Sequence, residues 1–179
     1  MIKRFKMLLF LMGLLIGGGA MIAATGTTAQ AKTSLRYFPT ALRRTWYHYE
    51  DGHYSRITFG YKHMRTTDYY DGSWHQYTTK IHVRNLNATH VSHHPSWMFA
   101  TLLYAHKMHW VNLYGWNQGA GDGDFYGVKI RHYRGYRIRT LSIGGGASLW
   151  TSGHYYATRK VARNLGTHHF SGVLYYPDF

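Results

Sequence analysis

Four basic side chains alternate along two short stretches of the chain that a glycine-containing turn connects. They are Lys129, Arg131, Arg137 and Arg139. Gly135 fits the left-handed position of a three-residue hairpin loop made by Tyr133, Arg134 and Gly135. This register pairs His132 with Tyr136 and places all four cations on one face. Because like charges side by side destabilise a hairpin, the pattern predicts an anion-binding stripe. A solvated face that keeps the strands soluble is the alternative interpretation.

Histidine is the second residue type in excess, with 14 in the chain. Neutral imidazoles bind zinc or copper where several converge. The adjacent pair at His93 and His94, and the pair at His168 and His169, would each point to opposite faces of a strand. The sequence therefore predicts no metal site and no cofactor, and favours scattered histidines that gain charge in acid.

Carboxylates are few, and most of them stand at expected turns. Asp68 and Asp71 lie among Tyr69, Tyr70 and Trp74, a composition that resembles a sugar-stacking loop. A turn with exposed tyrosines explains the same residues. No Gly-x-Ser-x-Gly nucleophile motif occurs in the chain. We therefore predict no catalytic residues and no enzymatic activity, and a hydrolase of sugars or cell-wall polymers is kept as an alternative.

The first 31 residues have the organisation of a secretory signal peptide. Lys3, Arg4 and Lys6 precede an apolar run from Met7 to Ala24, and the small-x-small sequence Ala29-Gln30-Ala31 follows. We expect cleavage after Ala31, which divides the chain into a signal peptide (1–31) and one extracellular domain (32–179). An uncleaved membrane anchor is the alternative, because the apolar run has marginal length for a span. The chain contains no cysteine, which excludes disulfides and a lipid thioether.

The expected mature part is strongly basic. It keeps 18 Lys and Arg residues against seven Asp and Glu, a net charge of +11. Besides the four cations of the hairpin, we expect contacts from a second group. That group is Arg43, Arg44, Lys80 and Arg84. Such an excess implies an anionic partner, which outside a cell means wall polymers or lipid headgroups, with nucleic acid bound only non-specifically.

Aromatic and β-branched residues dominate this part and favour strands over helices. Trp46–Glu50 and His53–Met64 flank Asp51-Gly52, a pair typical of a type I′ hairpin turn. In that register Trp46 faces Ile57 and becomes a core residue, and Phe59 and Tyr61 follow on the same face.

The rest of the chain continues in the same way. Alternation predicts a half-buried strand over 77–84, in which the polar face lies opposite Tyr77, Thr79, Ile81 and Val83. Apolar runs predict strands over 97–105 and 109–116. One short helix over 158–165, ended by Gly166, precedes a closing strand over 169–176. The sequence thus predicts an all-β domain, a single antiparallel barrel or sandwich with one short C-terminal helix, preceded by a signal-peptide helix.

Two short motifs carry a resemblance. The run Phe38-Pro39-Thr40-Ala41-Leu42-Arg43-Arg44-Thr45-Trp46-Tyr47, directly after the signal, is similar to small secreted proteins of lactobacilli that carry Leu-Arg-Gly-Thr-Trp-Tyr near their mature N-terminus. The stretch Gly153-His154-Tyr155-Tyr156-Ala157-Thr158-Arg159-Lys160 resembles a second patch of that group. The resemblance implies a habitat, the surface of a Gram-positive lactic acid bacterium, rather than an activity.

The first motif also resembles the Gly-x-Trp start of lipocalin and calycin barrels. In those barrels the tryptophan closes the base, and the corresponding residue here is Trp46. Arg44 stands where the motif has glycine. This resemblance implies a lipocalin-like barrel with room for a small apolar ligand.

From these observations we expect an exported, basic, non-enzymatic protein that binds anionic cell-envelope polymers at the cell surface. The alternatives are a lipocalin-like carrier of a small apolar ligand and a hydrolase of sugars or wall polymers.

Overall fold

The structure is a computed structural model that describes residues 33–119 and 121–177. The predicted signal peptide and its cleavage site lie outside the described residues. The strands, the helix and the core all belong to the compact unit that spans residues 31–179. Within the described residues, no helix has the length and apolar character needed to cross a membrane.

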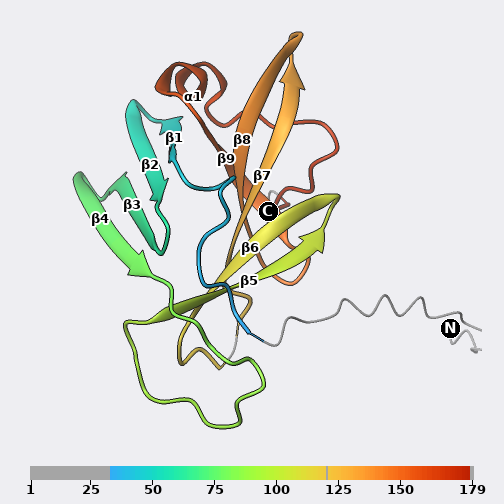
Figure 1. Cartoon of the computed structure of the whole chain (residues 1–179). Helices are drawn as coiled ribbons and strands as arrows, with labels where there is room; N and C mark the ends of the chain where they lie inside the picture. Colours follow the sequence, from blue (N-terminus) through green and yellow to red (C-terminus); the bar gives the residue numbers. More distant parts are fainter. Residues whose placement is uncertain (1–32, 120, 178–179) are drawn as a thin grey trace, which may run out of the picture. The chain divides into compact units, whose positions relative to one another are not determined.

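Nine strands form one antiparallel sheet that curls into a half-barrel (Figure 1). The order across the sheet is β4-β3-β2-β1-β9-β8-β7-β6-β5. The strands are β1 (Thr45–Glu50), β2 (His53–Phe59), β3 (His63–Tyr70), β4 (Ser73–Lys80), β5 (Met98–Ala105), β6 (Met108–Gly115), β7 (Asp124–Tyr133), β8 (Tyr136–Gly145) and β9 (Trp150–Tyr156). One short helix, α1 (Arg159–Leu165), follows β9. The prediction of an all-β fold with a single C-terminal helix is therefore confirmed.

The β1–β2 hairpin follows from its turn residues. Asp51 and Gly52 both have positive φ, 47° and 82°, as a type I′ turn requires. Trp46 pairs with Ile57 as predicted, and the indole is fully buried, with Nε1 donating to the carbonyl of Leu42 at 2.9 Å.

The predicted length of the second strand is wrong. β2 ends at Phe59, and a tight turn over 60–62 leads into β3. The backbone N–H of Gly60 donates to the carbonyl of His63 at 2.8 Å, which closes that turn. Tyr61, expected on the core face, is therefore exposed.

The strand predicted over 77–84 is also displaced. β4 covers Ser73–Lys80 and has one sheet neighbour, β3, so most of its side chains are exposed. Ile81 is buried, as predicted for the core face, but Tyr77 and Val83 are not. The chain leaves the sheet at Ile81, which forms an isolated bridge with Met98 at the start of β5.

The β5–β6 hairpin agrees with its prediction to within one residue at each boundary. His106 and Lys107 form the two-residue turn with φ of 51° and 58°. The pairing between β6 and β7 is short and ends at Trp110 opposite Gly127. Beyond that point β7 is paired only with β8.

The concave face of the half-barrel contains the main hydrophobic core. Its buried members come from both halves of the sheet and from the segment that precedes β1. They are Phe38, Leu42, Trp46, Ile57, Phe59, Met64, Ile81, Ala100, Val111, Leu113, Tyr126 and Leu141. The rings of Phe59 and Tyr126 meet edge to face at 5.3 Å across the concave face, so side chains fill the space between the two halves.

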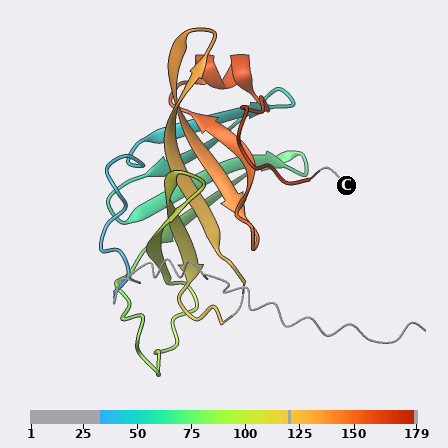
Figure 2. The same ribbon diagram turned by 90° about the vertical axis from the view of Figure 1, so that its right-hand side faces the viewer.

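The C-terminal segment, residues 167–177, covers the face of β8 and β9 opposite the concave core. Thr158 caps α1 by accepting a hydrogen bond from the backbone N–H of Val161. Gly166 ends the helix with a φ of 41°, as predicted. The closing strand expected over 169–176 is wrong, since this stretch makes only an isolated bridge between Thr151 and Tyr175. Figure 2 shows it in dark red beside β9.

We predict that Gly127→Ala destabilises the domain by about 1–3 kcal/mol, because overpacking a filled site costs this much. A Cβ at Gly127 would lie 2.7 Å from Cε of Met108 and 2.9 Å from Cε3 of Trp110. Urea unfolding followed by tryptophan fluorescence measures the effect. Gly153→Ala is the matched control, since Gly153 is also in a strand and a Cβ there would meet no atom within 4 Å. Equal stabilities of the two variants would contradict the tight packing at Gly127.

Candidate anion-binding site

The β7–β8 hairpin has a different register from the predicted one. Arg134 and Gly135 both have positive φ, 48° and 81°, and make a two-residue turn in place of the expected three-residue loop. Tyr133 therefore pairs with Tyr136, and His132 pairs with Arg137. A register change of one residue moves the side chains of one strand to the opposite face relative to the other.

The four cations of the hairpin consequently do not share one face. Lys129 pairs with Thr140, and Arg139 pairs with Ile130. Directly paired residues project to the same side of a sheet. Lys129 and Arg131 therefore lie on the face that the C-terminal segment covers, and Arg137 and Arg139 lie on the opposite, concave face. The prediction that the four cations form one stripe is therefore wrong. They form two pairs, one on each face of the hairpin.

Arg131 is half-buried beneath the C-terminal segment. Its Nε donates to Oγ1 of Thr140 at 3.1 Å, and its Nη2 donates to Oγ of Ser142 at 3.3 Å. The guanidinium carbon lies 5.0 Å from the centroid of the Phe170 ring. Burial lowers the pKa of Arg131, as expected for a cation that has lost part of its hydration. Both hydrogen-bond acceptors are neutral hydroxyls, so they orient the charge without neutralising it.

A pocket of about 280 Å³ opens beside Arg131. Three further basic or titratable side chains reach it from β7 and from the β5–β6 turn, and apolar side chains make most of the remaining wall. The lining residues are His106, Lys107, Met108, Trp110, Lys129, Arg131, Leu149, Thr151, Gly172, Val173 and Leu174. None of these residues is Asp or Glu, so the pocket is electropositive.

Contacts between basic side chains and carboxylates are scarce in the described part of the chain. Over residues 33–119 and 121–177, the one such contact joins His48 and Glu50, at 3.4 Å. A cation removed from water without an opposite charge costs free energy. An anion that enters the pocket would recover part of that cost at Arg131 and Lys129.

A buried histidine lies behind Arg131 in the same polar network. His154 Nδ1 is 3.1 Å from Oγ of Ser142, and Nε2 is 2.7 Å from the hydroxyl of Tyr175. The Tyr175 hydroxyl also accepts a hydrogen bond from the backbone N–H of Phe170 at 2.7 Å. These bonds attach the C-terminal segment to β8 and β9 and so hold it over Arg131.

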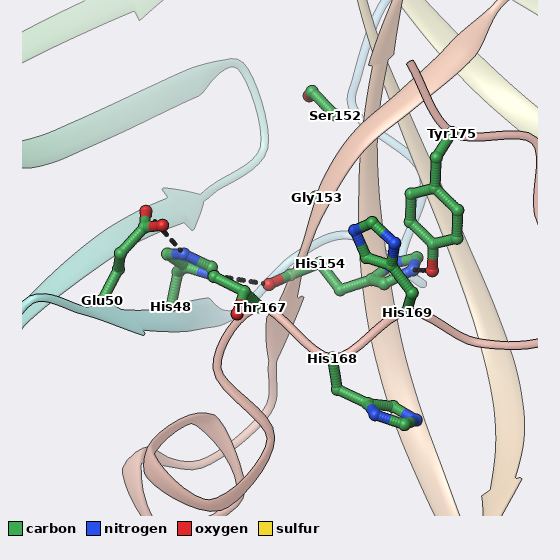
Figure 3. Close-up of a pocket in the computed structure, with 9 residues that line it drawn as sticks. All are labelled: His48, Glu50, Ser152, Gly153, His154, Thr167, His168, His169 and Tyr175. Atoms are coloured by element: carbon green, nitrogen blue, oxygen red, sulfur yellow. Dashed lines mark hydrogen bonds and ion pairs between the residues drawn. The ribbon is translucent and has the colours of Figure 1, made fainter. Parts of the chain in front are cut away.

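Figure 3 shows the open side of this network, a second pocket in which several histidines gather. Nδ1 of His48 is 2.9 Å from the backbone carbonyl of His154. The ring of His169 stacks on Tyr175 with 3.9 Å between centroids. Despite this density, the described residues contain no group of three or more His, Asp or Glu side chains arranged to hold a metal ion.

His154 does not behave as the predicted acid-charged surface histidine. Burial, and then the positive charge of Arg131, lower its pKa to about 3. Burial also lowers the pKa of His82. The expectation that the histidines gain charge in acid therefore fails for His154, which stays neutral near pH 5.

The second predicted group of cations is divided between structural and exposed roles. Arg43 and Arg84 each donate a hydrogen bond of 2.7 Å to a backbone carbonyl and pack on an aromatic ring. Arg44 and Lys80 are exposed. The structure does not gather these four residues into the pocket beside Arg131.

Comparisons of the chain with models of protein families, with curated proteins and with solved structures found no match. Function must therefore be inferred from the site itself.

We predict that His154 makes the fold sensitive to acid. The pKa of its ring is about 3 in the folded state and about 6.5 in an unfolded chain. The unfolded state therefore binds an extra proton between these values, and stability falls as the pH decreases through this window. At pH 5 the loss is about 2 kcal/mol relative to pH 7.

Urea unfolding of the chain and of His154→Gln at pH 7 and pH 5 checks this expectation. The variant should lose less stability than the parent between the two pH values. His90→Gln, at an exposed loop position, is the control and should follow the parent. If the stabilities of His154→Gln and the parent depended on pH in the same way, His154 would not be the cause of the acid sensitivity.

Proposed function

We propose that this chain is an exported, non-enzymatic protein that associates with the cell surface by binding anionic envelope polymers. The observation that carries the proposal is the half-buried guanidinium of Arg131, which no carboxylate of the described residues neutralises. Lys129 and Lys107 line the same pocket and add two more positive charges. A phosphate or carboxylate group of a polymer fits the size and charge of this pocket.

The remaining cations contribute in a less specific way. Arg137 and Arg139 are exposed on the concave side of the hairpin, and Arg44 and Lys80 are exposed elsewhere. Exposed charges of one sign attract a polyanion over about 8 Å at physiological salt. In this proposal they hold the polymer near the surface, and Arg131 with Lys129 binds one of its anionic groups.

The proposed location of the protein is the outside of a Gram-positive cell. Residues 1–31 support it, because their basic start, apolar run and Ala-Gln-Ala end are those of a cleavable signal. The resemblance to secreted proteins of lactobacilli agrees with that location. In an acidic medium, histidines that remain accessible would increase the positive charge of the surface.

A second candidate function has one observation in its favour. A groove of about 500 Å³ opens where β6 and β7 separate, and its wall is largely apolar. Leu102 and Tyr104, which line it, are 51% and 59% exposed. This groove is the feature that supports a lipocalin-like carrier of a small apolar ligand, in a barrel that Trp46 would close.

The first proposal predicts binding that depends on particular cations. In cosedimentation with purified Gram-positive cell walls at about 0.15 M salt, the double variant Lys129→Gln/Arg131→Gln should bind about tenfold more weakly than the parent, since a charge-assisted contact contributes at least this much. Salt at about 1 M should release the parent protein.

The double variant Arg137→Gln/Arg139→Gln removes the same net charge from the other face and is the matched control. It should bind more tightly than Lys129→Gln/Arg131→Gln. Lys107→Gln/Lys129→Gln leaves the half-buried Arg131 in place, so that a loss of binding in this variant does not come from a folding defect at Arg131. Retention of the parent on walls in about 1 M salt, or equal losses in the two matched variants, would refute the site.

The carrier function makes a different prediction. An uncharged fluorescent probe such as N-phenyl-1-naphthylamine should bind with the same affinity at low salt and at about 1 M salt. Leu102→Lys should abolish binding, because it places a charge in the groove. The exposed Leu174, outside the groove, gives the control Leu174→Lys. No uptake of the probe by the parent protein would rule the carrier out.

A further inference from the structure

A groove on the convex side of the sheet combines an exposed indole with two arginines. It has a volume of about 490 Å³ and lies across β1 to β4, next to the first turn of α1. Its lining residues are Tyr47, Gly52, His53, Tyr54, Arg56, Thr67, Trp74, Gln76 and Arg159. Neither Asp nor Glu is among them.

Trp74 is the large flat surface of this groove. It is 53% exposed, whereas none of the other five tryptophans is exposed. Its ring meets Tyr69 at 5.3 Å and His53 at 6.1 Å, both near perpendicular. The His53 and Tyr69 rings stack on each other at 3.8 Å. The indole is thus held by its neighbours while much of its surface stays free.

The two arginines stand in the groove with defined orientations. Nε of Arg56 donates to Oγ1 of Thr67 at 3.2 Å. The guanidinium of Arg159 lies 5.5 Å from the ring centroids of both Tyr47 and Tyr54. Within the described residues neither guanidinium has an acidic partner. A guanidinium offers a planar fork of donors that matches a carboxylate or a phosphate.

We propose that this groove binds a segment of an acidic oligosaccharide. The apolar C–H face of a pyranose ring packs on Trp74, and the carboxylate of the same or the next sugar pairs with Arg56 and Arg159. The exposed amide of Gln76 is placed to bond sugar hydroxyls. The inference rests on the proposed function and deepens it, since it names acidic sugars as the chemistry of the envelope polymer.

Single-stranded nucleic acid also combines rings with charge, but the groove fits it less well. Proteins that bind it stack successive bases on several aromatic side chains along a basic channel. Here a single exposed tryptophan lines the groove, and its tyrosine neighbours Tyr47 and Tyr54 are already packed against Arg159. One platform beside two cations suits one sugar ring and one carboxylate.

Isothermal titration of the full chain with hexagalacturonate tests the proposal. Its methyl-esterified form keeps the sugar rings and removes the charge, so the two ligands separate stacking from ion pairing. The parent should bind the acid form about tenfold or more tighter than the ester. Trp74→Ala should weaken both forms severalfold, and Arg56→Gln/Arg159→Gln should weaken only the acid form.

Matched controls lie elsewhere on the surface. Tyr136→Ala removes an exposed aromatic ring from β8, and Arg36→Gln/Arg134→Gln removes the same charge as the groove variant. Both should bind hexagalacturonate like the parent. Equal affinity of the parent for acid and ester, an unaffected Trp74→Ala, or tighter binding of oligodeoxythymidylate through the same residues would overturn the proposal.

The outcome is separable from that of the wall-binding experiment. Walls that still require Lys129 and Arg131, with no binding of hexagalacturonate, would refute the acidic-sugar groove alone. Binding of hexagalacturonate that requires Trp74, by a protein that does not bind walls, would refute the proposed function and leave the groove as a sugar site.

Discussion

The two-residue turn at Arg134 and Gly135 determines which side of the sheet every side chain of β7 and β8 occupies. Both residues adopt a positive φ, and this fixes Tyr133 opposite Tyr136. Since side chains alternate along a strand, the turn sends Arg131 toward the C-terminal segment and Leu141 into the concave core. The cationic pocket, the core and the contact of the C-terminal segment with Arg131 all depend on this register.

The C-terminal segment is the second constraint, and it acts through one histidine. Residues after Gly166 form no strand within the described part of the chain, yet Phe170 is buried and Tyr175 bonds to His154. This contact shields His154 from solvent, so its ring stays neutral. Arg131 is then the charged member of the network. Ordering of an irregular segment thus leaves the cation of Arg131 half-buried.

The sequence predicts what local chemistry determines. The turn at Asp51-Gly52 and the end of α1 at Gly166 are predicted correctly, because a turn and a helix end are encoded by the residues that form them. The register of β7–β8 is not, because Gly135 fits both a two-residue and a three-residue loop. Likewise nothing near His154 in the sequence indicates Ser142 and Tyr175 as its partners, since their contact depends on how the C-terminal segment folds back.

Acid acts on the pocket and on the fold in opposite directions. Accessible histidines gain charge as the pH falls, which increases the attraction for a polyanion. His154 resists protonation because of burial and Arg131, so the same change in pH removes stability. A bound anion beside Arg131 would offset that loss, because it binds the folded state alone. In the proposed function, polymer binding and resistance to acid are therefore coupled through the network that joins Arg131, Ser142 and His154.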